Sequence, residues 1–259
     1  MNYKAYIAAA IVAMAPAFAS AATVDINFQA FGAKKNSADI AGAIAARDAF
    51  IGSMPRITQE NFDGYTACDN SNGTSCAFSP LDTKVGRFEG INPSITNGGS
   101  QVAPKDKIVV RKNTPNPFNR FDIEGTDGNW LDSNDMNGIS WDIPGNTGLS
   151  NIVKIAFFLT DVDDVGKVQF ELSANHNSLT NNITNNPSGK LADGNLFLVT
   201  MLFSDAADGL NIRMVSGTGD GFGVDGITIA AVPLPAAGFL LFGALGGLAA
   251  LRRRRKMAA

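Results

Sequence analysis

Three aspartates, Asp161, Asp163 and Asp164, stand close together directly after an apolar stretch of the chain. Two carboxylates on one loop could act as general acid and general base on a glycosidic bond. The same residues are also typical of a hydrated turn or a cation site, so these interpretations stay open. The sequence has no Gly-x-Ser-x-Gly motif, no phosphate-binding glycine loop and a single histidine, His176, within an Asn-rich stretch. We therefore expect a protein that is not an enzyme, with a secreted glycoside hydrolase as the remote alternative.

Two tryptophans bear on sugar binding. Trp130 is flanked by turn residues, so its ring could stack on the face of a sugar, although packing is the commoner use of tryptophan in a β-protein. Trp141 alternates with Ile139 and Ile143, which predicts a core position. Trp130 is therefore the candidate carbohydrate contact. A carbohydrate-binding module that engages exopolysaccharide is the alternative function.

Residues 1–21 have the features of a secretory signal peptide. Lys4 supplies a positive charge, residues 7–14 are apolar, and Ala19-Ser20-Ala21 is a small-residue cleavage site. We expect export through the secretion translocon and a mature chain that begins near Ala22.

The other end of the chain has three parts. The motif Val232-Pro233-Leu234-Pro235-Ala236 is followed by an apolar run, residues 237–251, and then by Arg252-Arg253-Arg254-Arg255-Lys256. The sixteen uncharged residues 236–251 would rise about 24 Å as a helix, slightly less than the roughly 30 Å hydrocarbon core. A buried core helix is the alternative, but the cationic flank matches the cytoplasmic side of a membrane span. The sequence therefore predicts a transmembrane helix over residues 237–251.

Residues 232–256 resemble the PEP-CTERM sorting signal of Gram-negative bacteria, in its VPLPA variant. The resemblance implies recognition by an exosortase, a membrane-embedded cysteine transpeptidase, with the tail removed or exchanged near Pro235 and Ala236. It also implies a transient inner-membrane anchor, followed by delivery to the cell surface or the extracellular matrix. Val232 and Leu234 stand where the commoner signal has Pro and Glu, so the exosortase and the cleaved bond are left open.

The body between these segments, residues 22–231, is acidic. All 24 acidic residues lie between Asp25 and Asp225, whereas six of the 21 Lys and Arg belong to the leader and the tail. The body thus carries about nine net negative charges, which argues against nucleic acid and anionic membrane surfaces as partners. Twenty of the acids are Asp, which both turns and calcium-binding loops use.

Cys68 and Cys76 are the only cysteines, and turn residues fill the space between them. In an exported chain such a pair predicts a disulfide that closes a loop or a hairpin tip.

The body contains one convincing helix and many strands. Asn36 or Ser37 can cap the helix, Asp39 suits its first turn, and Gly52 and Pro55 end it. The expected apolar stripe of the helix consists of Ile40, Ala43, Ile44, Ala46 and Phe50. After Pro55, period-two alternation predicts strands around residues 155–159, 168–172, 196–203, 210–214 and 224–229. Short strands without a βαβ rhythm predict an all-β fold, an antiparallel β-sandwich in one domain.

The body also resembles jelly-roll ectodomains and jelly-roll carbohydrate-binding modules, through residues 57–64 after the helix and residues 221–227 at the end. In those modules the first and last strands run together, and an acidic residue from each holds a structural calcium ion. The resemblance implies that Glu60 or Asp63 lies beside Asp225 as a calcium ligand. Gly226 stands where related endings have a second acid, so one ligand is missing from the pattern.

These observations together predict an exported, exosortase-sorted protein of the cell surface or matrix. Its β-sandwich is expected to be non-catalytic, stabilised by a disulfide and by calcium.

Overall fold

The computed structural model describes residues 23–33, 35–68, 75–91, 107–112, 119–124, 128–134, 136–145, 151–162, 171–174, 179–182, 191–207, 209–216 and 221–232. The predicted signal peptide lies outside these residues, and so do the predicted transmembrane segment, the basic stop and the sorting motif beyond Val232. His176, Asp163 and Asp164 are outside them as well. No helix among the described residues has the length and apolar character needed to cross a bilayer.

The helix α1 (Ser37–Ile51) begins and ends where the sequence predicts. The Asn36 side chain accepts a hydrogen bond from the Ala38 N–H at 2.9 Å, which satisfies one of the free donors of the first turn. Gly52 follows the last turn with φ of 60°, a conformation that favours glycine. The predicted apolar stripe faces the protein, with Ala43 fully buried.

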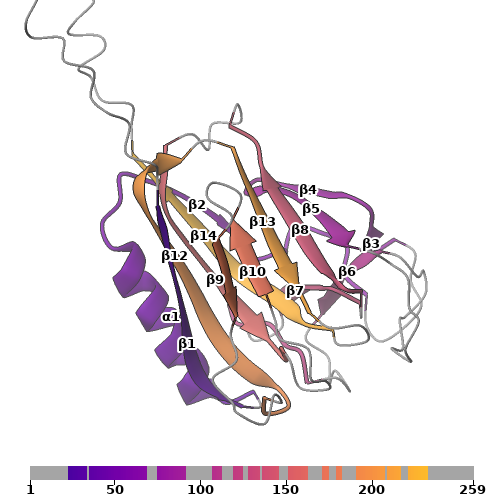
Figure 1. Ribbon diagram of the computed structural model, residues 1–259. Coiled ribbons are helices and arrows are strands. Elements are labelled where there is room, and N and C mark those ends of the chain that lie inside the picture. Colours follow the sequence, from indigo (N-terminus) through magenta and orange to yellow (C-terminus); the bar gives the residue numbers. More distant parts are fainter. Residues whose placement is uncertain are drawn as a thin grey trace, which may run out of the picture.

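The strands form two antiparallel sheets that pack face to face, which confirms the predicted β-sandwich (Figure 1). The larger sheet has the order β1-β12-β9-β14-β7-β6-β3, and β2 also pairs with β14. Its strands are β1 (Val24–Ala33), β2 (Arg56–Glu60), β3 (Ala77–Phe78), β6 (Ile108–Lys112), β7 (Asn129–Asp132), β9 (Ile152–Thr160), β12 (Asn195–Ala207) and β14 (Gly223–Ala231).

The smaller sheet has the order β11-β10-β13-β8-β5-β4. Its strands are β4 (Leu81–Thr83), β5 (Gly86–Ile91), β8 (Gly138–Ile143), β10 (Glu171–Ala174), β11 (Leu179–Asn182) and β13 (Leu210–Val215). The strand predicted around residues 168–172 is described only from Glu171 onward, as the start of β10.

The last strand, β14, lies inside the larger sheet. β9 runs along one of its edges, while the other edge is shared by β7 at residues 223–224 and by β2 at residues 227–231. The two partners meet around Gly226, where φ is 56° and the register with β9 shifts. The first strand, β1, pairs with β12 at the far edge. The resemblance implies that the strand around residues 57–64 runs beside the one around residues 221–227, and the antiparallel pairing of β2 with β14 agrees with it.

The main core fills the space between the sheets. Phe157 of the larger sheet meets Trp141 of the smaller one edge to face at 5.9 Å, and Phe88 stacks on Trp141 at 5.3 Å. The predicted alternation of β9 and β13 is confirmed, because Ile155, Phe157, Leu159, Leu210, Ile212 and Met214 all face this core. Burial of each such side chain stabilises the fold by about 1.5–3 kcal/mol relative to exposure.

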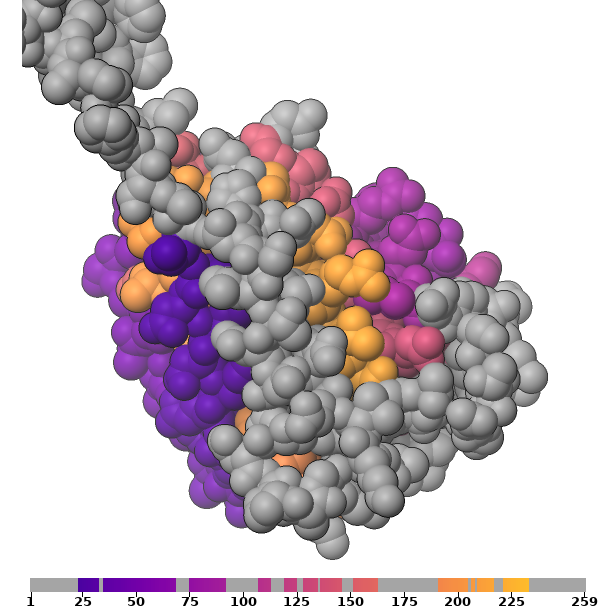
Figure 2. Space-filling view, viewed as in Figure 1, coloured from indigo at the N-terminus to yellow at the C-terminus, as the bar shows by residue number. Residues whose placement is uncertain are grey.

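A second apolar layer covers the outer face of the larger sheet. There α1 packs on Ala156 and Phe158 of β9 and on Leu196 and Leu198 of β12. The flank formed by β1 and α1 is indigo to purple in Figures 1 and 2. Because β9 and β12 are covered on both faces, they are nearly continuous apolar runs in the sequence, as is usual for doubly covered strands.

Candidate functional site

The segment 119–124 packs on the outer side of the larger sheet, next to α1. Phe121 and Ile123 join the apolar cluster under the helix. The charged residues between and beside them form ion pairs: Arg120 with Asp132 at 2.9 Å, Asp122 with Lys35 at 3.1 Å, and Glu124 with Arg47. These pairs tie the segment to β7, to the residue before the helix cap, and to α1.

Four buried charges form a network at one end of this segment. Asp132 of β7 binds Arg111 of β6 and Arg120, and the Arg120 Nε lies 3.4 Å from Asp161. Each side chain is at least nine-tenths buried, and the two cations balance the two anions. Burial opposes ionisation of Asp132, but Arg120 and Arg111 outweigh it and hold the pKa of this carboxyl below its usual range.

Asp161, the first residue of the aspartate loop, belongs to this network. Its Oδ1 accepts a hydrogen bond from the Gly194 N–H at 2.8 Å, and the residue is buried. Because the Asp161 carboxylate binds the buried Arg120 and a peptide N–H, it stabilises the turn after β9. The hypothesis of a catalytic loop therefore finds no support at Asp161, whereas Asp163 and Asp164 lie outside the described residues.

A second buried carboxyl, Asp225 of β14, has acidic neighbours instead. Its Oδ2 accepts N–H groups of Ile123 and Glu124 at 2.7 and 3.4 Å, and its Oδ1 accepts that of Gly226 at 2.6 Å. Burial raises the pKa of Asp225 well above its usual range, and the charges of Asp122 and Asp63 raise it further against these hydrogen bonds.

The predicted calcium ligands lie in this part of the molecule. Glu60 ends β2 opposite Ile227 of β14, and Asp63 is near enough to influence the pKa of Asp225. Each of the three carboxylates accepts a hydrogen bond from at least one peptide N–H group. Phe62 N–H donates to Glu60 and Asn129 N–H donates to Asp63, in addition to the bonds of Asp225 given above. Within the described ranges, no three His, Cys, Asp or Glu side chains are arranged to hold a metal ion. Calcium binding stays a prediction from the resemblance.

Trp130 is completely buried, so the prediction of an exposed sugar platform is wrong at this residue. Its ring packs over Gly223 of β14, where an added Cβ would lie 3.0 Å from the ring. Turn residues on both sides suggested exposure, but β7 is an inner strand, and Arg120 binds Asp132 on the same face of β7 as Trp130. Trp141 is buried as predicted.

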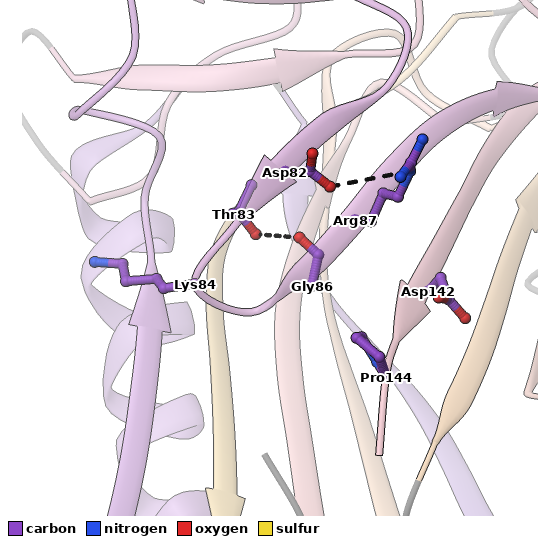
Figure 3. A pocket seen from close by; sticks show the side chains of 7 residues that line it. All are labelled: Asp82, Thr83, Lys84, Gly86, Arg87, Asp142 and Pro144. Atoms are coloured by element: carbon purple, nitrogen blue, oxygen red, sulfur yellow. Dashed lines mark hydrogen bonds and ion pairs between the residues drawn. The ribbon is translucent and has the colours of Figure 1, made fainter. Parts of the chain in front are cut away.

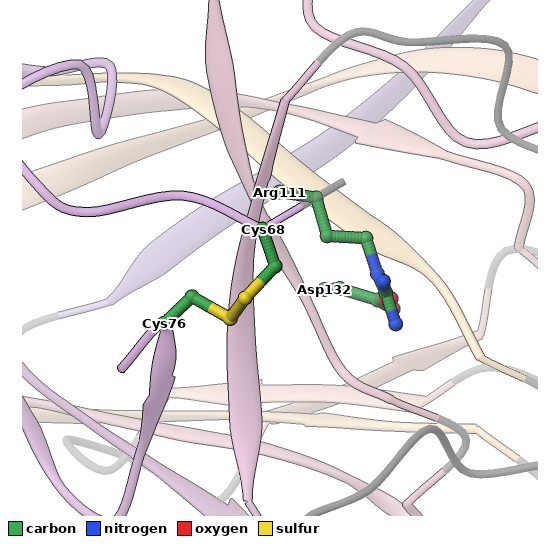
Figure 4. The surroundings of a disulfide bond; sticks show 4 residues. All are labelled: Cys68, Cys76, Arg111 and Asp132. Atoms are coloured by element: carbon green, nitrogen blue, oxygen red, sulfur yellow. A yellow bond between two sulfur atoms is a disulfide. The ribbon is translucent and has the colours of Figure 1, made fainter. Parts of the chain in front are cut away.

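The predicted disulfide between Cys68 and Cys76 is confirmed (Figure 4). Both cysteines bind the backbone of β6: Cys68 N–H donates to the Val110 carbonyl, and Val110 N–H donates to the Cys76 carbonyl. Cys68 and Cys76 are therefore both fixed at the β6 edge of the larger sheet. Figure 4 shows it beside Arg111 and Asp132, so it lies next to the buried charge network.

A pocket of about 380 Å³ opens at the turn between β4 and β5 (Figure 3). Four charged side chains line it, two acidic and two basic, with Thr83, Gly86 and Pro144: Asp82, Lys84, Arg87 and Asp142. Arg87 lies between the two acids across neighbouring strands, 3.9 Å from Asp82. The turn is held by the Thr83 hydroxyl, which donates to the Gly86 carbonyl, and by buried Trp141, whose Nε1–H donates to the Val85 carbonyl.

Sequence reasoning missed the charge network and the pocket. The alternation of polar and apolar residues in 119–124 is a signal that could have found the covering segment. Nothing local reveals that Arg111 and Asp132 are buried partners, because only the β6–β7 pairing brings them together.

No family model and no curated protein matches this chain. Among solved structures it is similar to CBM35 from Cellvibrio japonicus Abf62, at 10% identity and a TM-score of 0.25, over 69% of this chain and 95% of that one. It is also similar to the K3 adhesin domain of Lys-gingipain from Porphyromonas gingivalis, at 12% identity and a TM-score of 0.26, over 70% of this chain and 94% of that one. The K1 adhesin domain of the same protein is similar at 12% identity and a TM-score of 0.24, over 81% of this chain and 99% of that one. At such TM-scores the fold assignment rests on the sheets themselves.

Proposed function

We propose that this chain is an exported protein whose β-sandwich is carried to the cell surface or matrix by an exosortase-read tail. The observation that supports this most directly is where the sandwich ends. β14 finishes at Ala231, and the Val232 N–H donates to the Asn151 carbonyl as the first motif residue leaves the sheet. Cleavage near Pro235 and Ala236 would therefore leave all the described strands in place.

A non-catalytic role agrees with the buried charges. Three buried carboxyls of the described residues bind arginines or peptide N–H groups inside the fold: Asp132, Asp161 and Asp225. The disulfide suits an oxidising compartment outside the cytoplasm. Both features support a stable delivered domain rather than a reaction centre.

The test is the intact mass of the mature protein from the membrane and medium fractions of its native host. We expect a C-terminus near Pro235, with or without an added group. A double variant, Pro233→Ala with Pro235→Ala, should keep the full tail, whereas Ala192→Ser, far from the motif, should be processed normally. A native chain that keeps Arg252 to Lys256 would contradict sorting and indicate a permanent inner-membrane anchor.

Carbohydrate binding is the second candidate, and the pocket at the β4–β5 turn supports it in place of Trp130. Its size falls in the range of about 300–1,000 Å³ usual for small-ligand sites. Carboxylates and an arginine side by side could accept from and donate to sugar hydroxyls. On a glycan array, Arg87→Ala and Asp142→Ala should lose a binding signal that Glu89→Ala, exposed on the same strand as Arg87, retains. The absence of binding by the unaltered protein would contradict this candidate.

A further inference from the structure

Both ends of the described sandwich lie together. The Ser204 N–H donates to the Thr23 carbonyl, and the Val232 N–H donates to the Asn151 carbonyl. Val24 pairs with Phe203 of β12, and Ala231 with Ile152 of β9. We call this end, where β1, β2 and β9 begin and β14 finishes, the tail end, because the sorting signal continues from it.

The tail end carries two exposed apolar side chains. Among the described residues, Ile57 and Leu202 are the large hydrophobic side chains that stand exposed, each at 44%. They belong to one row across four strands: Leu202 pairs with Lys154, Lys154 with Ala230, and Ala230 with Ile57. Because directly paired residues point to the same face of a sheet, both side chains lie on the outer face.

Lys154, which lies between the two apolar residues in this row, already forms hydrogen bonds within the protein. Lys154 Nζ donates to the carbonyls of Phe50 and Ile51 at 2.6 and 3.5 Å, at the C-terminal end of α1. It therefore compensates the negative end of the helix dipole. Asp25 of β1 pairs with Leu202, is exposed, and adds a negative charge at that end of the row, opposite in sign to Lys154. Ile57 and Leu202 thus present exposed apolar surface on either side of buried Ala230 and half-buried Lys154, in a body that is acidic overall.

The length of chain after Val232 limits how far the tail end can stand from a membrane. Ala237, where the predicted span begins, follows five residues later, which reach at most about 18 Å when fully extended. The headgroup layer occupies roughly 5–8 Å on each side of the hydrocarbon core. The apolar row lies two residues before Val232, only about 7 Å along the strand from that end.

We propose that the tail end is a membrane-docking face, with Ile57 and Leu202 set into the headgroup layer while the tail is anchored. This rests on the proposed membrane insertion of residues 237–251. The acidic body does not favour an anionic surface, so the contact is apolar and is expected with neutral lipid. Docking would hold the motif Val232 to Ala236 at the bilayer surface, where a membrane-embedded transpeptidase works.

The test uses the full chain reconstituted into phosphatidylcholine vesicles. Since Cys68 and Cys76 are bridged, a single new thiol can carry an environment-sensitive fluorophore, placed by Ile57→Cys or Leu202→Cys. The matched control is Ala192→Cys, exposed just before β12 at the opposite end of the sheet. We expect nitroxide-headgroup lipids to quench the fluorophores at positions 57 and 202 at least threefold more than the one at position 192.

The remaining outcomes separate the two proposals. If the chain floats with the vesicles but the fluorophores at positions 57 and 202 are quenched no more than the one at position 192, the docking face is overturned and the anchor stands. A chain that does not float with vesicles overturns both. Self-quenching at position 57 without quenching by lipid would assign the row to a contact between protein copies and overturn the membrane proposal.

Discussion

The two buried carboxyls Asp132 and Asp225 show how the same side chain takes opposite electrostatic roles in one fold. Asp132 faces Arg111 and Arg120, which favour its ionised form. Asp225 faces peptide N–H groups and two further acids, and its burial favours the protonated form. The two residues therefore affect stability in opposite directions as the pH changes.

Replacement of Asp132 by Asn should destabilise the protein strongly at about neutral pH, because it leaves Arg111 and Arg120 buried without their shared anion. Loss of one partner of a buried pair typically costs about 3–5 kcal/mol. The pKa of Asp132 is lowered in the folded state, so its contribution is present above the unfolded pKa of about 3.9 and is lost as the pH falls. Urea unfolding should show the gap between the two proteins closing below about pH 4. A gap that does not depend on pH would contradict the assignment.

Asp225→Asn should show the reverse dependence. The pKa of Asp225 is raised in the folded state, so its protonation favours folding, and this stabilisation is lost as the pH rises through the folded pKa. The melting temperature of the unaltered protein, relative to the variant, should therefore rise as the pH is lowered through the folded pKa toward the unfolded pKa of about 3.9. Asp63→Asn, which removes one acidic neighbour, should weaken that slope. Parallel melting curves for the three proteins would rule out a raised pKa at Asp225.

Calcium can be tested at the same residues. If calcium binds Glu60, Asp63 or Asp225 as the resemblance implies, the melting temperature should be higher in calcium than in a chelator. The free energy of unfolding should increase by about 2.7 kcal/mol when the free calcium concentration is a hundred times the dissociation constant. Asp225→Asn should abolish the difference, whereas Asp82→Asn, in the pocket near the β4–β5 turn, should keep it. Equal melting temperatures in both buffers would contradict the prediction.

The sequence predicted which segments form helix and strands better than it predicted which strands pair with one another. Helix α1 follows from its cap at Asn36 and its stop at Gly52, and strand β13 from the alternation of Leu210, Ile212 and Met214, because these signals are local. The pairing of β2 with β14 does not follow from such local signals, and only the resemblance of residues 57–64 and 221–227 to jelly-roll modules implies it. The prediction that Trp130 is exposed was wrong because its burial also depends on a distant contact. The ring packs over Gly223, some ninety residues later in the sequence.

The cap of α1 gives a prediction at this level. Asn36→Ala removes the acceptor for the Ala38 N–H and should lower the free energy of unfolding by about 0.5–2 kcal/mol. Asn36→Ser, which can still cap, should lie close to the unaltered protein. Urea unfolding of the three proteins checks this. If Ala and Ser are equally destabilising, the effect does not arise from the capping hydrogen bond.

As a whole, the described sandwich lies before the proposed sorting signal, and this arrangement can be tested by truncation. A chain ending at Pro235 keeps the last described bond to the tail, Val232 N–H to the Asn151 carbonyl, and should unfold at the same urea concentration as the full chain. A chain ending at Val224 loses most of β14, whose residues are all buried and which pairs with β2, β7 and β9. That chain should not fold cooperatively, because the opened edges of β2 and β9 and both apolar layers would be exposed to water. Equal stability of the two truncated chains would mean that β14 is not the strand that closes the domain, and the delivered unit would then have to end earlier than Ala231.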